Sequence, residues 1–499
     1  MEQGATCHAP EVLDAINPET RASMAQVFVT APSRVPAIVA CAQDAARAWG
    51  DLPFGSRAAA LARLREVVAR RAHEIAETIA CGMGKPLIEA LLFEVKRVLE
   101  TLDDCIAHAS DDLSDEPIAA LVTLPALLGR YGALLQARTP RAVVCVIAPV
   151  SAPFERAMTP AVLALAAGNA VIVKPSSSAP LVGVLIERLF DEALLDFPGL
   201  AQVVHGAGAL GRLVARSAGV DAVIFAGSTP VGRQLQAELA ALQRPALFEL
   251  GGADPVIVCD DANLERAANA TVFGRFSNNG QACGAVKRVY VQRTVADAFI
   301  HKVMHKVRAL KSGPYTNPFC ELGPLANGRD LEHLRAVLQD ALDHNAQLLT
   351  GGFPAHVTGH DHGERRSAAR QGWYWPPAVL TNVDHSMRVM KEPLFGPILP
   401  IQAFEDDREA ILLANDTAYG FDACIFSGDP ARAEHIATGL KAGCAVVNDV
   451  FVHGARPVPQ GGAAHNDGHN DREPQWFPYS AAKLHAIERA MTLPDRGET

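Results

Sequence analysis

The chain has 499 residues, of which 49% are hydrophobic and 20% are charged, and its formal net charge is −10. A chain of this length is too long for one hydrophobic core, so two or three lobes are expected, and its composition excludes a disordered protein. The excess of acidic residues argues against nucleic acid or an anionic membrane as the main partner, because both attract basic surfaces.

Nothing in the chain reads as a targeting or membrane-spanning segment. The stretch MEQGATCHAPEV lacks the basic segment and apolar run of a secretory signal. The longest apolar stretch, residues 161–173, contains Gly168 and Asn169 and is too short to span a bilayer. Ten cysteines are scattered without paired spacing, which is typical of a reducing compartment. The sequence therefore predicts a cytoplasmic enzyme.

The first hundred residues are expected to be helical, because apolar residues such as Leu61, Leu64 and Val68 recur at helical spacing. After residue 141, short apolar runs alternate with helical segments, which predicts a parallel, doubly wound sheet with ligands at the carboxyl ends of its strands. The strand-like runs of this first series are AVVCVIAP, AVIVKP, AQVVHG, AVIFAG and ALFELGG.

A second alternating series begins at Pro255, with helices expected near residues 295–311 and 330–345. The polar segment 353–372 is expected to be an exposed loop. Two doubly wound α/β lobes with a crevice between them are the fold class that these patterns predict. The strand-like runs of the second series are PVIV, RVYVQ, AVL, ACIF and CAVVND.

The stretch GAGALG, with Gly206, Gly208 and Gly211, follows a strand-like run and matches a dinucleotide-binding fingerprint. An acidic residue should end a strand about twenty positions later, but Asp221 precedes the run AVIF instead of ending it. A plain strand-to-helix turn is therefore the preferred interpretation.

A different set of motifs occurs in a fixed order: PVSAPFER, VIVKPSSS, FAGSTPVGR, FELGGADP and NNGQACGAVKR. Together they resemble the aldehyde dehydrogenase superfamily. The segments GMGKPLIEA, ELGPLANGRD, LLTGG, LFGPILPI and AVVNDVFVH extend the resemblance over nearly the whole chain. Several motifs in the right order are more specific than any one of them.

The resemblance implies an aldehyde dehydrogenase-like fold, with two α/β lobes and a small oligomerisation hairpin. Residues 1–122 and 141–251 would form a dinucleotide-binding domain, and residues 252–460 a catalytic domain. Residues 123–140 and 461–499 would form an element that bridges subunits. The implied assembly is a homodimer or a homotetramer, and the implied partner is a small aldehyde.

Cys283 matches the nucleophile of the family. A free cysteine is mostly protonated at neutral pH, so backbone N–H groups at a turn or helix start would help its thiol to ionise. The stretch NNGQACGA is a glycine-flanked turn that suits this role. The alternative for any one cysteine is a buried structural side chain.

Glu249 ends the apolar run PALFE, just before two glycines and 34 positions upstream of Cys283. A carboxylate in such surroundings is costly unless it is paired or has a task. By resemblance it is the general base that activates the hydrolytic water, and acylating relatives that use coenzyme A typically lack it. The alternative is a solvent-facing carboxylate at a strand end.

A nicotinamide cofactor, NAD or NADP, is the next implication of the resemblance. Lys174 would hold the adenosine ribose, and the helix that begins near Gly227 and Ser228 would favour the pyrophosphate. Phe395 would lie near the nicotinamide ribose. The cofactor-binding residues implied by the resemblance are Lys174, Ser177, Gly227, Ser228, Val231, Leu250 and Phe395.

Three positions depart from the family pattern. Ser151 stands where the family has the asparagine that binds the oxyanion, and its hydroxyl is a shorter donor. Ser177 replaces a glutamate, which removes repulsion against a 2′-phosphate, so NADP is expected to be accepted. Pro393 replaces the glutamate that binds the nicotinamide ribose, although Glu392 is adjacent.

The substrate is less defined by the sequence. Pro160 and the stretch NDVFVH resemble the branch of the family that acts on fatty, aromatic and cinnamyl-type aldehydes. The loop after Val458 differs from the family. Three groups of histidines are expected to be surface residues without a metal. They are His301 with His305, His465 with His469, and His356 with His360 and His362.

The sequence leaves three functions open. The first is oxidation of an aldehyde to the acid with NAD or NADP, through a thiohemiacetal and a thioester on Cys283. The second is an acylating, coenzyme A-dependent dehydrogenase on the same fold, against which Glu249 argues. The third, motivated by Ser151, Ser177 and Pro393, is a catalytically weak homologue that acts as a binding or scaffold protein.

Overall fold

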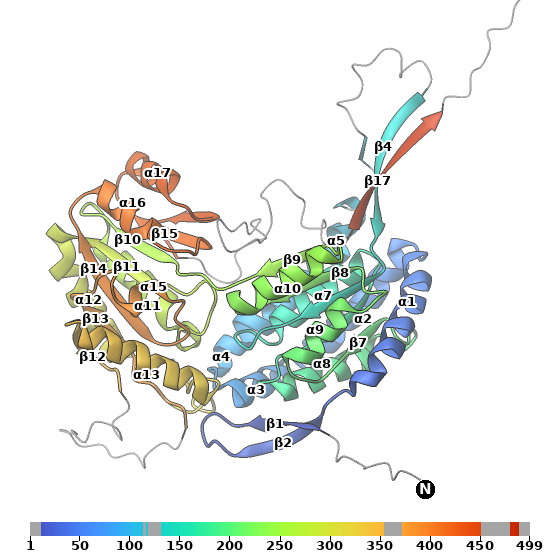
Figure 1. Cartoon of the computed structure of the whole chain (residues 1–499), viewed down its shortest axis with the longest axis horizontal. Helices are drawn as coiled ribbons and strands as arrows, with labels where there is room; N and C mark the ends of the chain where they lie inside the picture. The colour runs from blue at the N-terminus through green and yellow to red at the C-terminus, as the bar shows by residue number, and fades with distance from the viewer. Residues whose placement is uncertain (1–10, 113–115, 118–130, 354–371, 451–479, 489–499) are drawn as a thin grey trace, which may run out of the picture.

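The computed structural model describes residues 11–112, 116–117, 131–353, 372–450 and 480–488. Figure 1 shows two α/β lobes side by side and a pair of long strands, β4 and β17, that extends away from one of them. The predicted fold class, two α/β lobes built on mostly parallel sheets, is confirmed.

The first lobe is built on a five-stranded parallel sheet in the order β7-β6-β5-β8-β9. Its central strands are buried at every position, because helices pack on the sheet. These strands are therefore continuous apolar runs and do not show the alternation of apolar and polar residues that a strand with one solvated face has. The strands are β5 (Val143–Ile147), β6 (Ala170–Lys174), β7 (Ala201–Val203), β8 (Ala222–Ala226) and β9 (Ala246–Glu249).

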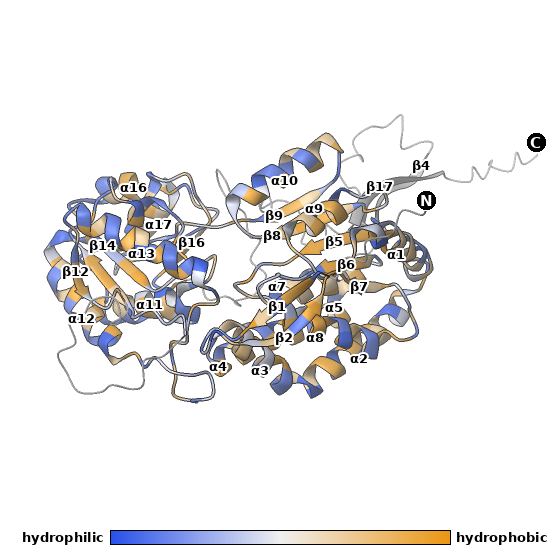
Figure 2. Cartoon of the chain, turned by 60° about the horizontal axis from the view of Figure 1, so that its bottom comes forward, coloured by the Kyte–Doolittle hydropathy of each residue, from blue (hydrophilic) through white to orange (hydrophobic). Residues whose placement is uncertain are grey.

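Helices of the first lobe pack on this sheet. Helices α1 and α7 contact β5 and β6, α8 contacts β7, and α10 contacts β9. The strands of this sheet are coloured mainly as hydrophobic in Figure 2, and buried apolar residues of the strands and helices form one core cluster. The helices are α1 (Val35–Gly50), α2 (Phe54–Arg70), α3 (Ala72–Met83), α4 (Leu87–Ala90), the π-helical turn η2 (Leu91–Val95), α5 (Lys96–Asp112), α7 (Glu155–Ala166), α8 (Pro180–Ala193), α9 (Gly208–Arg216) and α10 (Thr229–Ala241).

The strand order of the first sheet locates its ligand crevice. The chain proceeds outward from β5 to β6 and β7, then returns to the other side of β5 with β8 and β9. In open parallel sheets, ligands bind at the carboxyl ends of the strands where the order reverses, here between β5 and β8. The GAGALG stretch instead joins the edge strand β7 to α9, so the preferred interpretation as a plain strand-to-helix turn agrees with the structure.

The second lobe is built on a seven-stranded sheet in the order β12-β13-β14-β11-β10-β15-β16, in which β12 alone is antiparallel to its neighbour. The predicted strands are all present, and β12 and β14 are additional. The strands are β10 (Pro255–Val258), β11 (Arg288–Gln292), β12 (Gln347–Thr350), β13 (Ala378–Thr381), β14 (Ile398–Phe404), β15 (Asp422–Phe426) and β16 (Cys444–Val447).

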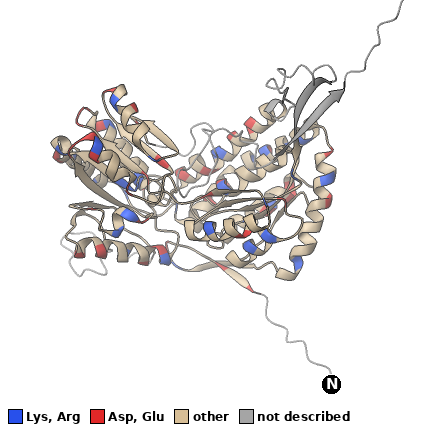
Figure 3. Ribbon diagram, turned by 45° about the horizontal axis from the view of Figure 1, so that its top comes forward, with Lys and Arg blue, Asp and Glu red and all other residues tan. Residues whose placement is uncertain are grey.

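The helices of the second lobe include the two that the sequence predicted, α12 and α13. The described helices and helical turns are α11 (Leu264–Phe276), η4 (Ser277–Gly280), η5 (Arg293–Val295), α12 (Ala296–Ala309), α13 (Gly328–Asp343), α15 (Arg388–Lys391), α16 (Asp407–Asn415) and α17 (Pro430–Gly439). No helix among the residues that the structure describes has the length and apolar character needed to cross a membrane. Basic and acidic side chains are interspersed on the helices of both lobes (Figure 3).

Two small sheets complete the described chain. The prediction that the first hundred residues are helical is wrong for the beginning, where β1 (Val12–Ile16) and β2 (Ser23–Phe28) form an antiparallel pair before the short turn η1 (Pro32–Arg34). Most residues of this pair are partly or fully exposed, so it carries no strong apolar alternation.

The second small sheet has the order β17-β4-β3, formed by β17 (Ser480–Glu488), β4 (Tyr131–Pro140) and β3 (Glu116–Pro117). β17 pairs antiparallel with β4, which brings together the two segments that the family resemblance assigned to one bridging element. Their role in joining subunits and the domain boundaries stay predictions. The predicted polar loop lies mostly in residues 354–371, outside the described residues.

The connection between β4 and β5 depends on one buried amide. Asn169 is 0% exposed, and its Oδ1 accepts hydrogen bonds from the backbone N–H groups of Arg141 (2.7 Å) and Ala142 (3.0 Å). Its Nδ2 donates to the carbonyl oxygen of Ala164 at 2.9 Å.

We expect Asn169→Ala to lower the free energy of unfolding by about 3 kcal/mol, because it leaves buried backbone groups without partners. The shift of the urea unfolding midpoint measures this effect. Asn269→Ala, at an exposed position of α11, is the matched control and should change stability by less than about 0.5 kcal/mol. Equal midpoints for the two variants would contradict the assigned role.

Candidate active site

The candidate site lies where the two large sheets meet end to end. Glu249 is the last residue of β9, at the carboxyl edge of the first sheet. Cys283 and Phe395 come shortly before β11 and β14, at the amino edge of the second sheet. Five residues, 250–254, join β9 to β10, so the two edges face each other over a short distance.

The segment before Cys283 has an unusual backbone. Asn278, Asn279 and Gly280 have φ values of 51°, 54° and 70°, in the left-handed region that costs energy for residues other than glycine. At Gly280 a Cβ atom would lie 2.6 Å from the carbonyl oxygen of Gly396, so only glycine fits. The two asparagines tolerate this conformation because their side chains bond to nearby backbone. The result is a tight turn that delivers Cys283 to the interface between the sheets.

Hydrogen bonds hold this turn to the first lobe. The backbone N–H of Asn278 donates to Glu89 Oε2 at 2.7 Å, and its Nδ2 donates to the carbonyl oxygen of Ser151 at 3.0 Å. The Nδ2 of Asn279 donates to the carbonyl oxygens of Gly323 and Pro324. The turn before Cys283 and the turn at Ser151 are therefore fixed relative to each other.

Lys287 holds the residues after the turn. Its side chain is 1% exposed, and its Nζ donates to three carbonyl oxygens, those of Ala282 (3.0 Å), Cys283 (2.7 Å) and Ala285 (2.9 Å). Burial lowers the pKa of Lys287, and the nearby carboxylate of Asp254 opposes that shift. The ammonium group thus serves as a fixed anchor for the loop that carries Cys283.

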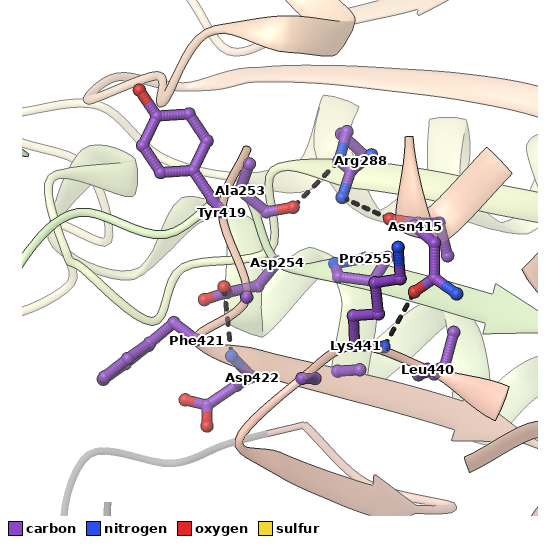
Figure 4. A pocket seen from close by; sticks show the side chains of 14 residues that line it. Ala253, Asp254, Pro255, Arg288, Asn415, Tyr419, Phe421, Asp422, Leu440 and Lys441 are labelled. Atoms are coloured by element: carbon purple, nitrogen blue, oxygen red, sulfur yellow. Dashed lines mark hydrogen bonds between the residues drawn. The ribbon is translucent and has the colours of Figure 1, made fainter. Parts of the chain in front are cut away.

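Two buried carboxyl groups accompany Lys287 at the amino edge of the second sheet. Asp254 precedes β10 and Asp422 begins β15, and each is 3% exposed. The backbone N–H of Asp422 donates to Asp254 Oδ1 at 3.3 Å (Figure 4). Burial raises the pKa of both carboxyl groups, and Asp254 raises that of Asp422 further. The ammonium group of Lys287 compensates the negative charge of this buried carboxyl pair.

Cys283 itself is partly buried in a turn. Burial raises the pKa of its thiol, although the charges of Arg156 and Lys287 act in the opposite direction. Desolvation is the larger of these effects on the Cys283 thiol, and the expectation that backbone N–H groups assist its ionisation stays a prediction.

Arg156, in the first turn of α7, joins Cys283 and Glu249 in one cluster. Its Nη1 lies 2.5 Å from Glu249 Oε2, and its Nε lies 3.1 Å from Glu155 Oε2. The charge of the guanidinium also acts on the Cys283 thiol. Burial alone would lower the pKa of Arg156, but Glu155, Glu249 and Cys283 raise it. Glu249 is therefore paired with a cation at the end of its strand.

The turn at Ser151 is held by a second buried ion pair. Lys85 and Glu94 are 3% and 0% exposed and contact each other directly. Lys85 Nζ also donates to the carbonyl oxygen of Ser151 at 3.2 Å, and Glu94 Oε2 accepts from the backbone N–H of Phe154 at 2.8 Å. Glu94 lies in the π-helical turn η2, a feature that often occurs at functional sites.

The residues predicted to bind a cofactor lie along the carboxyl edge of the first sheet. Lys174 ends β6 and is 5% exposed, and burial lowers the pKa of its ammonium group to about 8. Ser177 follows in a partly exposed turn. Gly227 and Ser228 precede α10, where Val231 is 53% exposed.

The start of α10 has unused hydrogen-bonding capacity. The side chain of Ser228 does not cap the helix, and among the described residues the buried Thr229 Oγ1 has no hydrogen-bond partner. Uncapped N–H groups and an orphaned hydroxyl at a helix start fit a phosphate group. Gly232 allows close packing of the helix on Leu250.

Phe395 lies close to the connection between β9 and β10. Its ring and the ring of Pro393 approach Gly251, and Lys287 Nζ lies 5.6 Å from the centroid of the Phe395 ring. Glu392, the acidic neighbour of Pro393, pairs instead with Arg388 at 2.7 Å and is thus occupied.

Comparisons with known proteins identify the family of this chain. Residues 6–475 match the aldehyde dehydrogenase family. A 4,4'-diapolycopene aldehyde oxidase of Methylomonas sp is 34% identical over 480 residues, which cover 91% of this chain and 86% of that protein.

The chain belongs to the aldehyde dehydrogenase family.

Solved structures of other aldehyde dehydrogenases share the fold over nearly their whole length. A 3,6-anhydro-L-galactose dehydrogenase in complex with NADP has a TM-score of 0.83 and 27% identity, covering 97% of each chain. An indole-3-acetaldehyde dehydrogenase of P. syringae in complex with NAD+ and IAA has a TM-score of 0.84 and 26% identity, covering 96% of this chain and 95% of that one.

Several residues of this aldehyde dehydrogenase site could not be recognised in the sequence. Arg156, Lys287 and Asp254 lie inside the quoted motifs, but their types are common at protein surfaces, and their partners are distant in the chain. The predicted surface histidines His301 and His305 are exposed on α12, whereas the other two histidine groups lie outside the described residues. Within the described ranges, no three side chains of the metal-binding types converge.

We expect Lys287→Met to destabilise this aldehyde dehydrogenase by about 3–5 kcal/mol, because it leaves three carbonyl oxygens and two buried carboxyl groups without their cation. Urea unfolding measures the change. Lys302→Met, which removes an exposed lysine 3.0 Å from Glu265, is the control and should cost less than about 1 kcal/mol. A loss for Lys287→Met as small as that of the control would refute the anchor role.

Proposed function

We propose that this aldehyde dehydrogenase uses NAD or NADP, with Cys283 as nucleophile and Glu249 as the base that activates the hydrolytic water. The observation that supports this proposal most is the Arg156 side chain, whose Nη1 lies 2.5 Å from Glu249 Oε2 and whose charge also acts on the Cys283 thiol. The candidate nucleophile and the candidate base thus both lie near one arginine side chain. Such an arrangement suits acyl transfer through a covalent intermediate.

The residues present fit a nicotinamide dinucleotide. Lys174 would bind the adenosine ribose, with Ser177 beside it, and Gly227 and Ser228 would present the start of α10 to the pyrophosphate. Val231, Leu250 and Phe395 would contact the adenine and nicotinamide ends. When bound, the cofactor supplies the acceptor for a hydride ion.

The residues of the chain carry the remaining chemistry. The Cys283 sulfur attacks the aldehyde carbon, and the backbone N–H of Cys283 with the Ser151 hydroxyl donates to the oxyanion. After the hydride leaves the carbon, a thioester joins the substrate to Cys283. Glu249 then takes a proton from a water molecule that attacks the thioester and releases the acid.

Fatty, aromatic and cinnamyl-type aldehydes are the proposed substrate class, on the basis of Pro160 and the stretch NDVFVH. A homodimer or homotetramer in the cytoplasm is the proposed setting. A panel of aliphatic and aromatic aldehydes, each tested with NAD and with NADP, defines the preference. Dependence of turnover on coenzyme A would instead favour the acylating chemistry.

We expect Cys283→Ala to abolish NAD(P)H formation, because the covalent intermediate cannot form. Glu249→Gln should still form about one NAD(P)H per active site, at a reduced rate, and then turn over at least about 100-fold more slowly, since hydrolysis depends most on Glu249. Rapid-mixing absorbance separates the burst from the steady state. Cys81→Ala, a partly buried cysteine on α3, is the control and should remain active. Full turnover by Cys283→Ala would overturn the proposed function.

We expect Ser177→Glu to lower kcat/KM with NADP about tenfold or more relative to NAD, because a carboxylate would repel the 2′-phosphate. The ratio of kcat/KM values for the two cofactors measures this. Ser178→Glu, at the exposed neighbouring position, controls for added negative charge. An unchanged ratio in Ser177→Glu would show that Ser177 does not face the adenosine ribose.

A further inference from the structure

Arg156 lies at a position where neither the helix dipole nor contact with solvent favours a cation. It lies in the first turn of α7, where the helix dipole favours negative side chains such as Glu155. Its side chain is only 16% exposed, so the guanidinium has lost most of its contact with water. Burying a guanidinium costs several kcal/mol unless anions surround it. Helix stability and solvation therefore do not account for an arginine at this position.

The surroundings of Arg156 point to a role at the reacting sulfur. Glu155 and Glu249 both pair with the guanidinium, and the Cys283 thiol is close enough for the charge of Arg156 to favour its thiolate. Among the charges near Cys283, Arg156 is the one that favours the thiolate most. A guanidinium has five N–H donors, so it can serve two carboxylates and a further anion at once.

The oxyanion site of this chain is short of donors. The family asparagine is replaced by Ser151, whose hydroxyl is a shorter donor, and the backbone carbonyl oxygen of Ser151 is held by Lys85 and Asn278. A cation close to the Cys283 sulfur is also close to the carbonyl carbon that this sulfur attacks. Its N–H groups could therefore reach the oxygen of that carbonyl.

We propose that Arg156 is a catalytic residue that binds the Cys283 thiolate and then the oxyanion of the tetrahedral intermediate, in place of the missing amide. This role rests on the proposed function of Cys283 and Glu249. The proton released in this step stays within the cluster. The Cys283 thiol gives its proton to the Glu249 carboxylate, which becomes neutral and releases its hold on the guanidinium.

Arg156 then turns toward the thiolate. The sulfur forms a bond to the aldehyde carbon, the π electrons of the carbonyl move to its oxygen, and an N–H of Arg156 donates to the resulting oxyanion. When the hydride leaves the carbon, the carbonyl forms again as a thioester, and the proton on Glu249 passes to solvent. The same guanidinium is then ready for the oxyanion that forms when water attacks.

The charge balance disfavours a different role, the binding of an anionic substrate. Two carboxylates already surround Arg156, so a third, permanent carboxylate on the aldehyde would be repelled. An oxyanion that forms only after Glu249 has taken a proton meets no such repulsion. The structure therefore favours uncharged aldehydes.

The test measures the alkylation rate of Cys283 by iodoacetamide from pH 6 to pH 10, and kcat with an uncharged aldehyde. The wild-type chain is compared with Arg156→Met and Arg156→Lys, and the rate of Cys283→Ala is subtracted. Arg71→Met is the matched control, because Arg71 also bridges two glutamates, Glu74 and Glu192, but far from Cys283. Thermal unfolding reports whether each variant is folded.

In Arg156→Met we expect the apparent pKa of the Cys283 thiol to rise by about one unit or more and kcat to fall about 100-fold or more. Arg156→Lys should recover part of both effects, because it restores the charge, and Arg71→Met should show neither. A wild-type alkylation profile with a kcat loss below about tenfold in folded Arg156→Met would overturn the proposal. So would a loss confined to carboxylate-bearing aldehydes, which would make Arg156 a substrate-binding residue.

The two proposals fail in different ways. If Cys283→Ala kept its turnover, the function proposed for Cys283 would be wrong, whatever Arg156 does. If Cys283→Ala is inactive and Arg156→Met behaves as wild type, the function of Cys283 stands and the role of Arg156 is wrong.

Discussion

The short connection between β9 and β10 is the constraint on which the site depends. Five residues, 250–254, cross from the carboxyl edge of one sheet to the amino edge of the other. A connection of this length keeps the end of β9 close to the start of β10, so residues at these two sheet edges can approach each other although they are distant in sequence. Glu249 begins this connection and Asp254 ends it, and the groups proposed to react lie at these facing edges.

Buried charge is the second property that shapes the site. Arg156, Lys287 and Lys85 each lose most of their contact with water, and each is compensated by carboxylates or by several carbonyl oxygens. Such groups add little net stability, because desolvation offsets the attraction between the charges. They do fix geometry, since a buried ion tolerates few alternative positions. The Cys283 loop and the Ser151 turn are both held in this way.

The sequence predicted the sheets far better than the chemistry around Cys283. Buried parallel strands appear as apolar runs, so the runs from AVVCVIAP to CAVVND could be recognised locally. The pair β1 and β2 was missed because most of its residues are partly or fully exposed and lack a clear pattern. Arg156 was missed for another reason. Its partner Glu249 lies 93 positions away, and nothing in the local sequence distinguishes it from a solvated arginine.

The charge on Arg156 also orders the two halves of the proposed reaction. While Arg156 Nη1 lies 2.5 Å from Glu249 Oε2, the guanidinium holds that oxygen of the carboxylate. Once negative charge develops at Cys283 or on the substrate oxygen, the guanidinium has a competing anion, and its attraction to Glu249 falls. Hydrolysis by Glu249 is therefore favoured after the covalent bond to Cys283 has formed. A single cation shared by base and nucleophile would thus limit the activation of water before the substrate is attached.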